Sequence, residues 1–157
     1  MDEREEKLRE EREREEREDK EKERRLIEQK EKEEALDHEY QERIEQEERN
    51  VASMRRIQEE MSCLNDSLNS CINLAAASIA NIAVRKRCES MRSDNQHVYL
   101  KANQTVDTAI DTTEKNVSRL QEEREQVQEE KKSINDQLLE HQSQMREKQE
   151  IQRLAEA

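Results

Sequence analysis

The sequence predicts an all-α fold: a long antiparallel helical hairpin with coiled-coil contacts and a charged single-helix extension at its N-terminal end. The 157 residues include no Gly and no Pro, so the usual residues for tight turns are missing. Charged residues make up 45% of the chain and hydrophobic residues only 30%, too few for a globular core. Apolar residues instead recur at steps of three and four, the spacing of a coiled-coil seam.

Residues 1–34 are expected to form a charged single α-helix, with a disordered tail as the alternative. Residues 1–50 contain 23 acidic and 14 basic residues, a net charge of −9. Acid-to-base pairs four residues apart, such as Glu13 with Arg17, each stabilise a helix by about 0.2–0.5 kcal/mol. Large apolar residues are too sparse here to form a seam with a partner helix.

The first coiled-coil arm is predicted over residues 35–91. It contains an unbroken apolar series, which we expect to form one side of the interaction seam. The series consists of Met54, Ile57, Met61, Leu64, Leu68, Cys71, Ala75, Ser78 and Ile82.

The second arm is predicted over residues 98–157, and a second series of the same spacing forms the other side of the seam. Three of its members, Arg124, Lys131 and His141, have charged ends, which we expect to reach outward while their stems pack. The series consists of Val106, Ile110, Thr113, Val117, Leu120, Arg124, Val127, Lys131, Ile134, Leu138, His141 and Met145.

A turn or hinge is predicted at residues 92–97, because Ser93 and Gln96 have the spacing of a capping box. A reversal there pairs residues whose numbers sum to 188, such as Leu68 with Leu120, and leaves residues 1–30 without a partner. The alternative is one continuous helix of about 235 Å in a parallel coiled-coil oligomer, at ~1.5 Å per residue.

Residues 72–84 are the most hydrophobic stretch, and the basic cluster Arg85, Lys86 and Arg87 follows them directly. The stretch has 13 residues, whereas a membrane-spanning helix needs about 20. We expect a helix-packing contact here, with the cluster as a possible docking patch. Attachment to a membrane surface or the cytoskeleton through residues 72–87 is the alternative.

The residue pattern predicts no enzyme, since no catalytic residues, metal ligands or cofactor-binding residues have a recognisable spacing. The net charge of −12 and the absence of Phe and Trp argue against direct nucleic-acid binding. We therefore expect a cytoplasmic structural or scaffold protein without a signal peptide, transmembrane segment or small-molecule substrate. Its expected partners are proteins, including further copies of itself.

Overall fold

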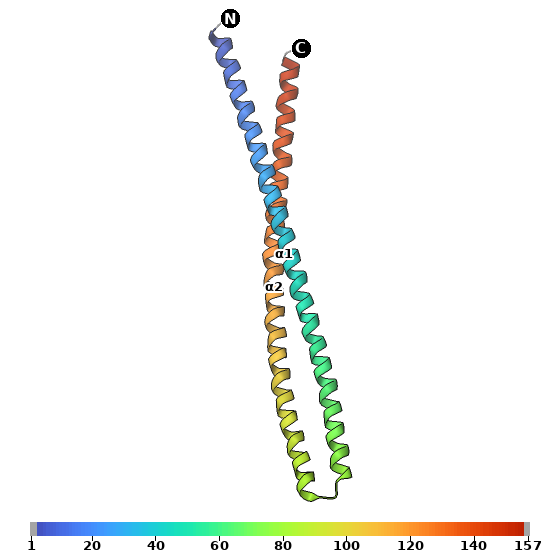
Figure 1. Cartoon of the computed structure of the whole chain (residues 1–157). Helices are drawn as coiled ribbons and strands as arrows, with labels where there is room; N and C mark the ends of the chain where they lie inside the picture. Colours follow the sequence, from blue (N-terminus) through green and yellow to red (C-terminus); the bar gives the residue numbers. More distant parts are fainter. Residues whose placement is uncertain (1–2, 156–157) are drawn as a thin grey trace. The chain divides into compact units, whose positions relative to one another are not determined.

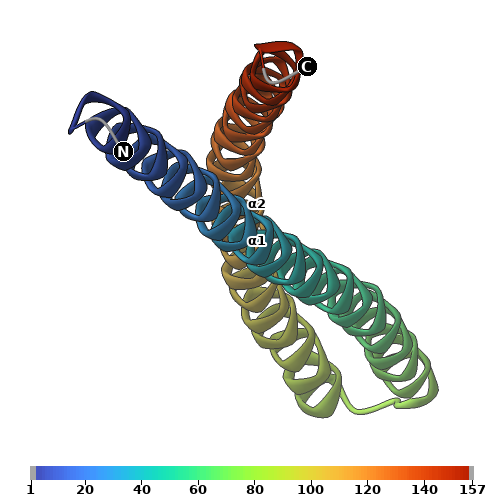
Figure 2. The same ribbon diagram turned by 90° about the horizontal axis from the view of Figure 1, so that it is seen from above.

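Two long helices form the part of the chain that the computed structural model describes, which is residues 3–155, with side chains from residue 6 onward. Helix α1 spans Glu3–Ser78 and helix α2 spans Ile82–Ala155. Figure 1 shows the helices joined by a short link at residues 79–81, and Figure 2 shows the link from above. The predicted all-α hairpin is confirmed, and the continuous helix is wrong. Residues 1, 2, 156 and 157 of the predicted segments lie outside the described residues.

The chain divides into two compact units, and each contains part of α1 and part of α2. The hairpin unit consists of Arg43–Leu120, which includes the link. The terminal unit consists of Met1–Glu42 together with Gln121–Ala157. Both predicted arms are therefore split between the two units.

The helices run antiparallel within the hairpin unit. Near the link, Arg92 Nη1 donates a hydrogen bond to Asn73 Oδ1 at 3.1 Å. Farther from the link, Gln58 Nε2 donates to Asn103 Oδ1 at 3.4 Å. Residue numbers fall along α1 as they rise along α2, as expected when a short link joins neighbouring helices.

The chain reverses at residues 79–81 because Asn81 caps the start of α2. Asn81 Oδ1 accepts a hydrogen bond from the Ala83 amide at 2.9 Å, and Asn is among the best residues at this position. The Arg85 guanidinium donates to the Ile79 carbonyl oxygen at 2.9 Å, which provides a partner for a carbonyl beyond the end of α1.

The predicted turn at residues 92–97 is wrong, since these residues lie inside α2. The spacing of Ser93 and Gln96 permits a capping box but does not require one, because both residues are also tolerated inside a helix. The Asn81 cap is used instead. Its signal in the sequence is one residue, Asn81, within residues 72–84, the apolar stretch for which a helix-packing contact is predicted.

The register predicted from residue numbers summing to 188 is also wrong. That register places Leu64 opposite Arg124, whereas Arg124 Nε donates to Asp37 Oδ1 at 2.7 Å. Met54 and Ile134, a predicted pair, belong to different units. Moving the reversal from residue 94 to residues 79–81 accounts for the difference, because every facing pair shifts with it.

The described part of the N-terminal segment, residues 3–34, belongs to α1 and is not a helix without a partner. From Asp19 onward it packs against α2: the Asp19 backbone oxygen lies 2.9 Å from His141 Nε2, and Lys148 Nζ lies 2.8 Å from Asp19 Oδ2. Leu26 is buried. In the observed register this segment packs against α2, whereas the predicted register left it without a partner helix.

Candidate interaction surfaces

The second predicted series lies along the contact between α2 and α1. None of its twelve positions is exposed. Five are buried: Ile110, Leu120, Val127, Leu138 and His141. The other seven, from Val106 to Met145, are half-buried. These positions therefore fill the contact in both units.

The first predicted series lies mostly outside the contact between the two helices. Met54 and Met61 are half-buried, but the other seven members are exposed. These are Ile57, Leu64, Leu68, Cys71, Ala75, Ser78 and Ile82. Most of this apolar stripe of α1 is therefore left exposed by the chain's own hairpin.

Asn side chains, together with the buried Ile72, lie between α1 and α2 in place of the exposed members of that stripe. Asn95 Nδ2 donates to Asn65 Oδ1 at 3.1 Å and lies 3.4 Å from Asn69 Oδ1. All three residues are half-buried. Polar contacts between paired helices fix their register at some cost in stability. Sequence reasoning missed them because it followed apolar residues alone.

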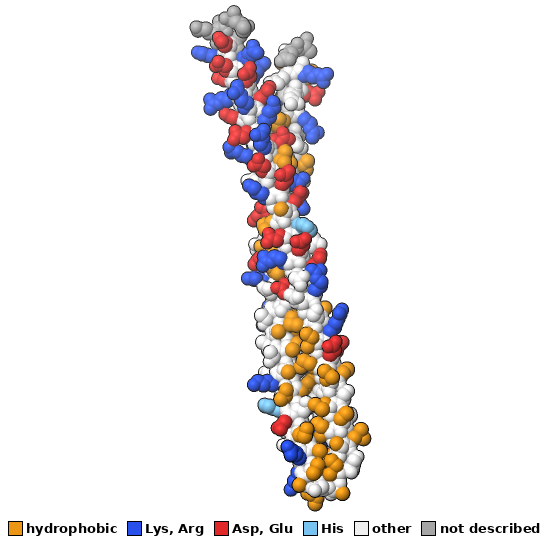
Figure 3. Space-filling view, viewed as in Figure 1, with side chains coloured by type: hydrophobic (Ala, Val, Ile, Leu, Met, Phe, Trp, Pro, Cys, Tyr) orange, Lys and Arg blue, Asp and Glu red, His pale blue; other side chains and the backbone are white. Residues whose placement is uncertain are grey.

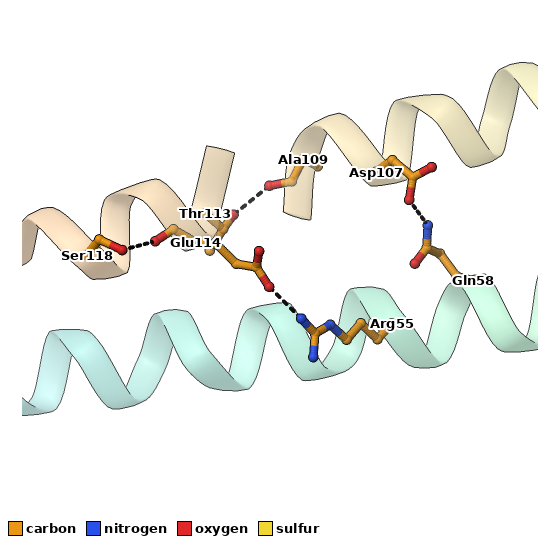
Figure 4. Close-up of polar contacts among 7 residues, drawn as sticks. All are labelled: Arg55, Gln58, Asp107, Ala109, Thr113, Glu114 and Ser118. Atoms are coloured by element: carbon orange, nitrogen blue, oxygen red, sulfur yellow. Dashed lines mark hydrogen bonds and ion pairs between the residues drawn. The ribbon is translucent and has the colours of Figure 1, made fainter. Parts of the chain in front are cut away.

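Charged and polar pairs line one edge of the hairpin unit. Figure 4 shows Arg55 of α1 paired with Glu114 of α2, and Gln58 bonded to Asp107. The contact between Asn73 and Arg92 continues this polar edge toward the link.

The exposed apolar residues of α1 lie on the side away from this polar edge. Successive residues in an α-helix are rotated by about 100°, so residues two apart point about 200° apart. Ile57 therefore lies nearly opposite Arg55, and Cys71 nearly opposite Asn73. The apolar stripe and the polar edge occupy opposite sides of α1.

Helix α2 adds a second stripe to the same side. Asn95 points toward α1, and helical spacing places Met91 about 40° to one side of it and Arg92 about 60° to the other. Because Arg92 bonds Asn73 on the polar edge, Met91 lies on the opposite edge. Val84 and Val98, each seven residues from Met91, share its position.

We call the resulting surface of the hairpin unit the apolar face. Figure 3 shows hydrophobic side chains gathered over this end of the helices. Exposure is substantial: Leu64 is 69% exposed, Val98 65% and Met91 54%. The face consists of Ile57, Met61, Leu64, Leu68, Cys71 and Ala75 of α1 with Val84, Met91 and Val98 of α2.

A polar cluster holds the terminal unit. Arg124 Nε lies 2.7 Å from Asp37 Oδ1, Gln128 Nε2 donates to the same oxygen at 3.2 Å, and Lys131 Nζ lies 3.8 Å from Oδ2. The hydrogen bond from Arg124 is the main cause that lowers the pKa of Asp37, although partial burial opposes it. Arg124 and Lys131 of α2 thus both contact α1 through the same Asp37 carboxylate.

A second ionic contact lies nearer the chain ends. The hydrogen bond from Lys148 lowers the pKa of Asp19, and the same bond raises the pKa of Lys148. Asp19 also presents its backbone oxygen to His141, which is only 3% exposed. The His141 imidazole is therefore packed between the helices and is almost inaccessible to solvent.

The basic cluster Arg85, Lys86 and Arg87 follows the link in the first turns of α2, and all three residues are exposed. Leu74 and Ile82, each 70% exposed, lie in sequence on either side of the link. We call these five residues the tip. An apolar surface therefore adjoins positive charge at the tip.

The remaining residues of chemical interest do not form a common site. His38 is exposed beside Glu42 in the terminal unit, and His97 is exposed in the hairpin unit. Cys63, Cys71 and Cys88 are free thiols. Among residues 3–155, no group of His, Cys, Asp and Glu side chains has the arrangement of a metal site. Neither α1 nor α2, over the same residues, contains a stretch long and apolar enough to cross a bilayer.

Comparisons with protein-family models, with curated proteins and with solved structures find no significant match to this chain.

Proposed function

We propose that this chain is a non-enzymatic coiled-coil scaffold that assembles with protein partners, including further copies of itself, through the apolar face. The observation that carries the proposal is the exposure of seven of the nine members of the regular heptad series of α1, which the chain's own hairpin leaves uncovered. Large contiguous apolar patches on proteins in water are typical of interaction sites. A series stepping by three and four residues suits a helical partner.

The charge distribution supports this role. Asp66 is the single charged residue between Met61 and Val84, whereas residues 1–50 carry a net charge of −9. Charged residues are depleted at the centre of protein interfaces. The rest of both helices is densely charged, which suits solvated helices that space the partners they join.

A cytoplasmic location belongs to the same proposal. Cys63 and Cys71 are exposed free thiols on one helix, eight residues or about 12 Å apart at ~1.5 Å per residue, too far for a disulfide between them. Reducing compartments preserve such thiols, whereas oxidising ones favour crosslinks between chains.

Leu64→Asp is expected to weaken assembly by at least about tenfold, because burying one Leu contributes ~1.5–3 kcal/mol and ~1.4 kcal/mol corresponds to tenfold in affinity. Sedimentation equilibrium measures this directly. The parent protein should exceed its monomer mass of 18.9 kDa with increasing concentration, and the variant should remain near it.

The matched control is Leu139→Asp, which changes an exposed Leu of the terminal unit, 55% exposed, and should leave the mass distribution unchanged. A parent protein that stays monomeric at every concentration, or equal effects of the two substitutions, would contradict the proposed role of the apolar face.

A second candidate function is peripheral membrane attachment or cytoskeletal docking through the tip. The favouring observation is the placement of exposed Leu74 and Ile82 in sequence on either side of the link, with Arg85, Lys86 and Arg87 just after it. Apolar residues beside a basic cluster bind anionic lipid surfaces, at about 1 kcal/mol per basic residue.

Flotation with phosphatidylserine vesicles tests this candidate. Binding should fall about 30-fold on combining Lys86→Glu with Arg87→Glu, given ~1 kcal/mol for each lost base. Arg85 is left unchanged because it bonds the Ile79 carbonyl oxygen. Lys131→Glu combined with Lys132→Glu, far from the tip in sequence, is the charge-matched control. Equal flotation of all three proteins, or none by the parent, rejects the membrane candidate.

A further inference from the structure

We infer that a groove on the polar edge of the hairpin unit, beside the link, binds an acidic helix of a partner protein through Arg85 and Arg92. None of the residues that line this groove belongs to the apolar face, so the inference goes beyond the proposed function and does not depend on it. It follows from the shape of the groove, the hydrogen-bond partners of the two arginines and the local charge.

The groove lies between the two helices next to the link and has a volume of about 350 Å³. A second hollow, of about 580 Å³, shares three of its residues and extends it along α2 as far as Leu100. From Arg85 to Leu100 the two hollows run about 22 Å, or roughly four helical turns, which is room for a helix of a partner. We call the first hollow the link groove; it is lined by Asn73, Ala76 and Ala77 of α1 and by Arg85, Glu89 and Arg92 of α2.

Arg85 and Arg92 line the link groove from the same side of α2. They are seven residues, or two helical turns, apart, so their positions are separated by about 10 Å along the axis. Lys86 and Arg87 are rotated by about 100° and 200° from Arg85 and point away from the groove. The link groove therefore contains a defined pair of guanidinium groups, separate from the other two bases near the link.

Both arginines donate to neutral oxygen atoms. Arg85 Nη2 donates to the Ile79 carbonyl oxygen at 2.9 Å, and Arg92 Nη1 donates to the Asn73 amide oxygen at 3.1 Å. A guanidinium group has further N–H donors arranged as a fork, and its strongest hydrogen bonds are those to a carboxylate. An acidic ligand can therefore add a stronger bond at each arginine without breaking the present one.

The charge near the link favours such a ligand. Residues 67–93 contain four basic residues and one acidic residue, Glu89, a net charge of +3. The whole chain carries −12, so the remaining residues carry −12 − (+3) = −15. Farther from the link in the same unit, Arg55 has the Glu114 carboxylate of the chain itself as its partner. A carboxylate of a ligand would give Arg85 and Arg92 the kind of partner that Arg55 already has.

The ligand that matches this pair is a helix with two carboxylates seven residues apart. That spacing presents both groups on one side of the helix, about 10 Å apart, as Arg85 and Arg92 are on α2. Glu89 lies between the two arginines and lines the same groove, so its negative charge opposes the ligand. Removing that charge should therefore strengthen binding.

Fluorescence anisotropy with two labelled synthetic peptides and the full-length chain tests the inference. Both peptides are Ala- and Gln-rich helices of about 20 residues with two Glu and the same composition. The Glu residues are seven positions apart in the first peptide. In the second they are five apart, which places them about 140° apart around the helix. The first peptide should bind the parent protein at least about fivefold more tightly.

Three single substitutions locate the site. Arg92→Gln should weaken binding of the first peptide at least about fivefold, and Glu89→Gln should tighten it about twofold. Lys86→Gln removes the same charge as Arg92→Gln but points away from the groove, so it should change the affinity less than about twofold. Circular dichroism at 222 nm checks that the helices are kept. Glu89 is exposed, so its substitution tests the site even if Arg92→Gln disturbs the contact with Asn73.

Equal losses for Arg92→Gln and Lys86→Gln, or equal affinities of the two peptides, indicate general attraction to positive charge and overturn the inference. Absence of binding to the parent protein overturns it as well. If phosphatidylserine vesicles displace the peptide and Arg92→Gln also abolishes flotation, a lipid surface occupies the link groove and the inference is wrong. Leu64→Asp should leave peptide binding unchanged, so the proposed assembly through the apolar face and this inference can fail independently.

Discussion

Leu120→Asp is expected to unfold the hairpin unit, with a loss of about 4 kcal/mol or more in the free energy of unfolding. Leu120 is 1% exposed, the most completely buried large side chain among the described residues. The substitution removes a buried Leu, which costs ~2–5 kcal/mol, and adds a carboxylate without a partner. Domains of this size have a total stability of about 5–15 kcal/mol, so the loss is a large fraction of it.

Thermal unfolding followed by circular dichroism at 222 nm measures the effect. The control is Leu100→Asp, in the same helix and the same unit, where the side chain is 56% exposed and outside the apolar face. The melting temperature should fall steeply for the first variant and little for the second. Similar melting temperatures would mean that the contact between α1 and α2 at Leu120 does not stabilise the chain.

Asp37→Asn is expected to lower the stability of the terminal unit by about 1–2 kcal/mol at pH 7, the scale of hydrogen bonds to charged groups in a partly buried site. The Asp37 side chain is 17% exposed and accepts from Arg124 and Gln128, so its charge is only partly screened by water. Without the charge, Arg124 and Lys131 lose their shared counter-ion.

The pH dependence of this effect has a definite sign. Because the folded pKa of Asp37 is lowered from 3.8, the carboxylate stabilises the folded chain fully above the unfolded value. The stabilisation is lost as the pH falls through the lowered folded pKa. The difference between parent and Asp37→Asn should therefore be constant near neutral pH and disappear in strong acid.

Urea unfolding of both proteins from pH 7 down to pH 2 tests this dependence. Glu21→Gln is the control, because Glu21 pairs with Arg25 on an exposed surface and such pairs contribute only a few tenths of a kcal/mol. A difference for Asp37→Asn that persists unchanged at pH 2 would show that the amide disturbs packing, not charge pairing.

The helical content and the side of α2 that faces α1 could be predicted from the sequence. Residues from Val106 to Met145 bury their heptad positions because that stripe is the most apolar one available to α2 in this part of the chain. Periodicity is a sufficient guide when one stripe dominates, even where Arg124 and Lys131 occupy it.

The contact side of α1 could not be predicted in the same way, because two adjacent stripes compete there. Leu64 and Leu68 belong to the more apolar stripe, whereas Asn65 and Asn69 belong to the one that faces α2. Heptad spacing identifies a stripe without identifying the partner that covers it. The position of the link was wrongly predicted for a related reason. Asn81 gives a capping signal of one residue, whereas Ser93 and Gln96 give a two-residue capping signal that the structure does not use.

The link at residues 79–81 also sets the order in which the two units can close during folding. Asn73 and Arg92 are separated by 19 positions in the chain, whereas Asp19 and His141 are separated by 122. Closing the longer loop in an unfolded chain costs roughly 1.6 kcal/mol more, from (3/2)RT ln(122/19). We therefore expect contacts near Asn81 to form first, each of them shortening the effective loop for the next. We infer that the helices pair progressively from the link toward the chain ends. A substitution of Asn81 that slows formation of the link would then also delay folding of the terminal unit, although it changes no residue in that unit.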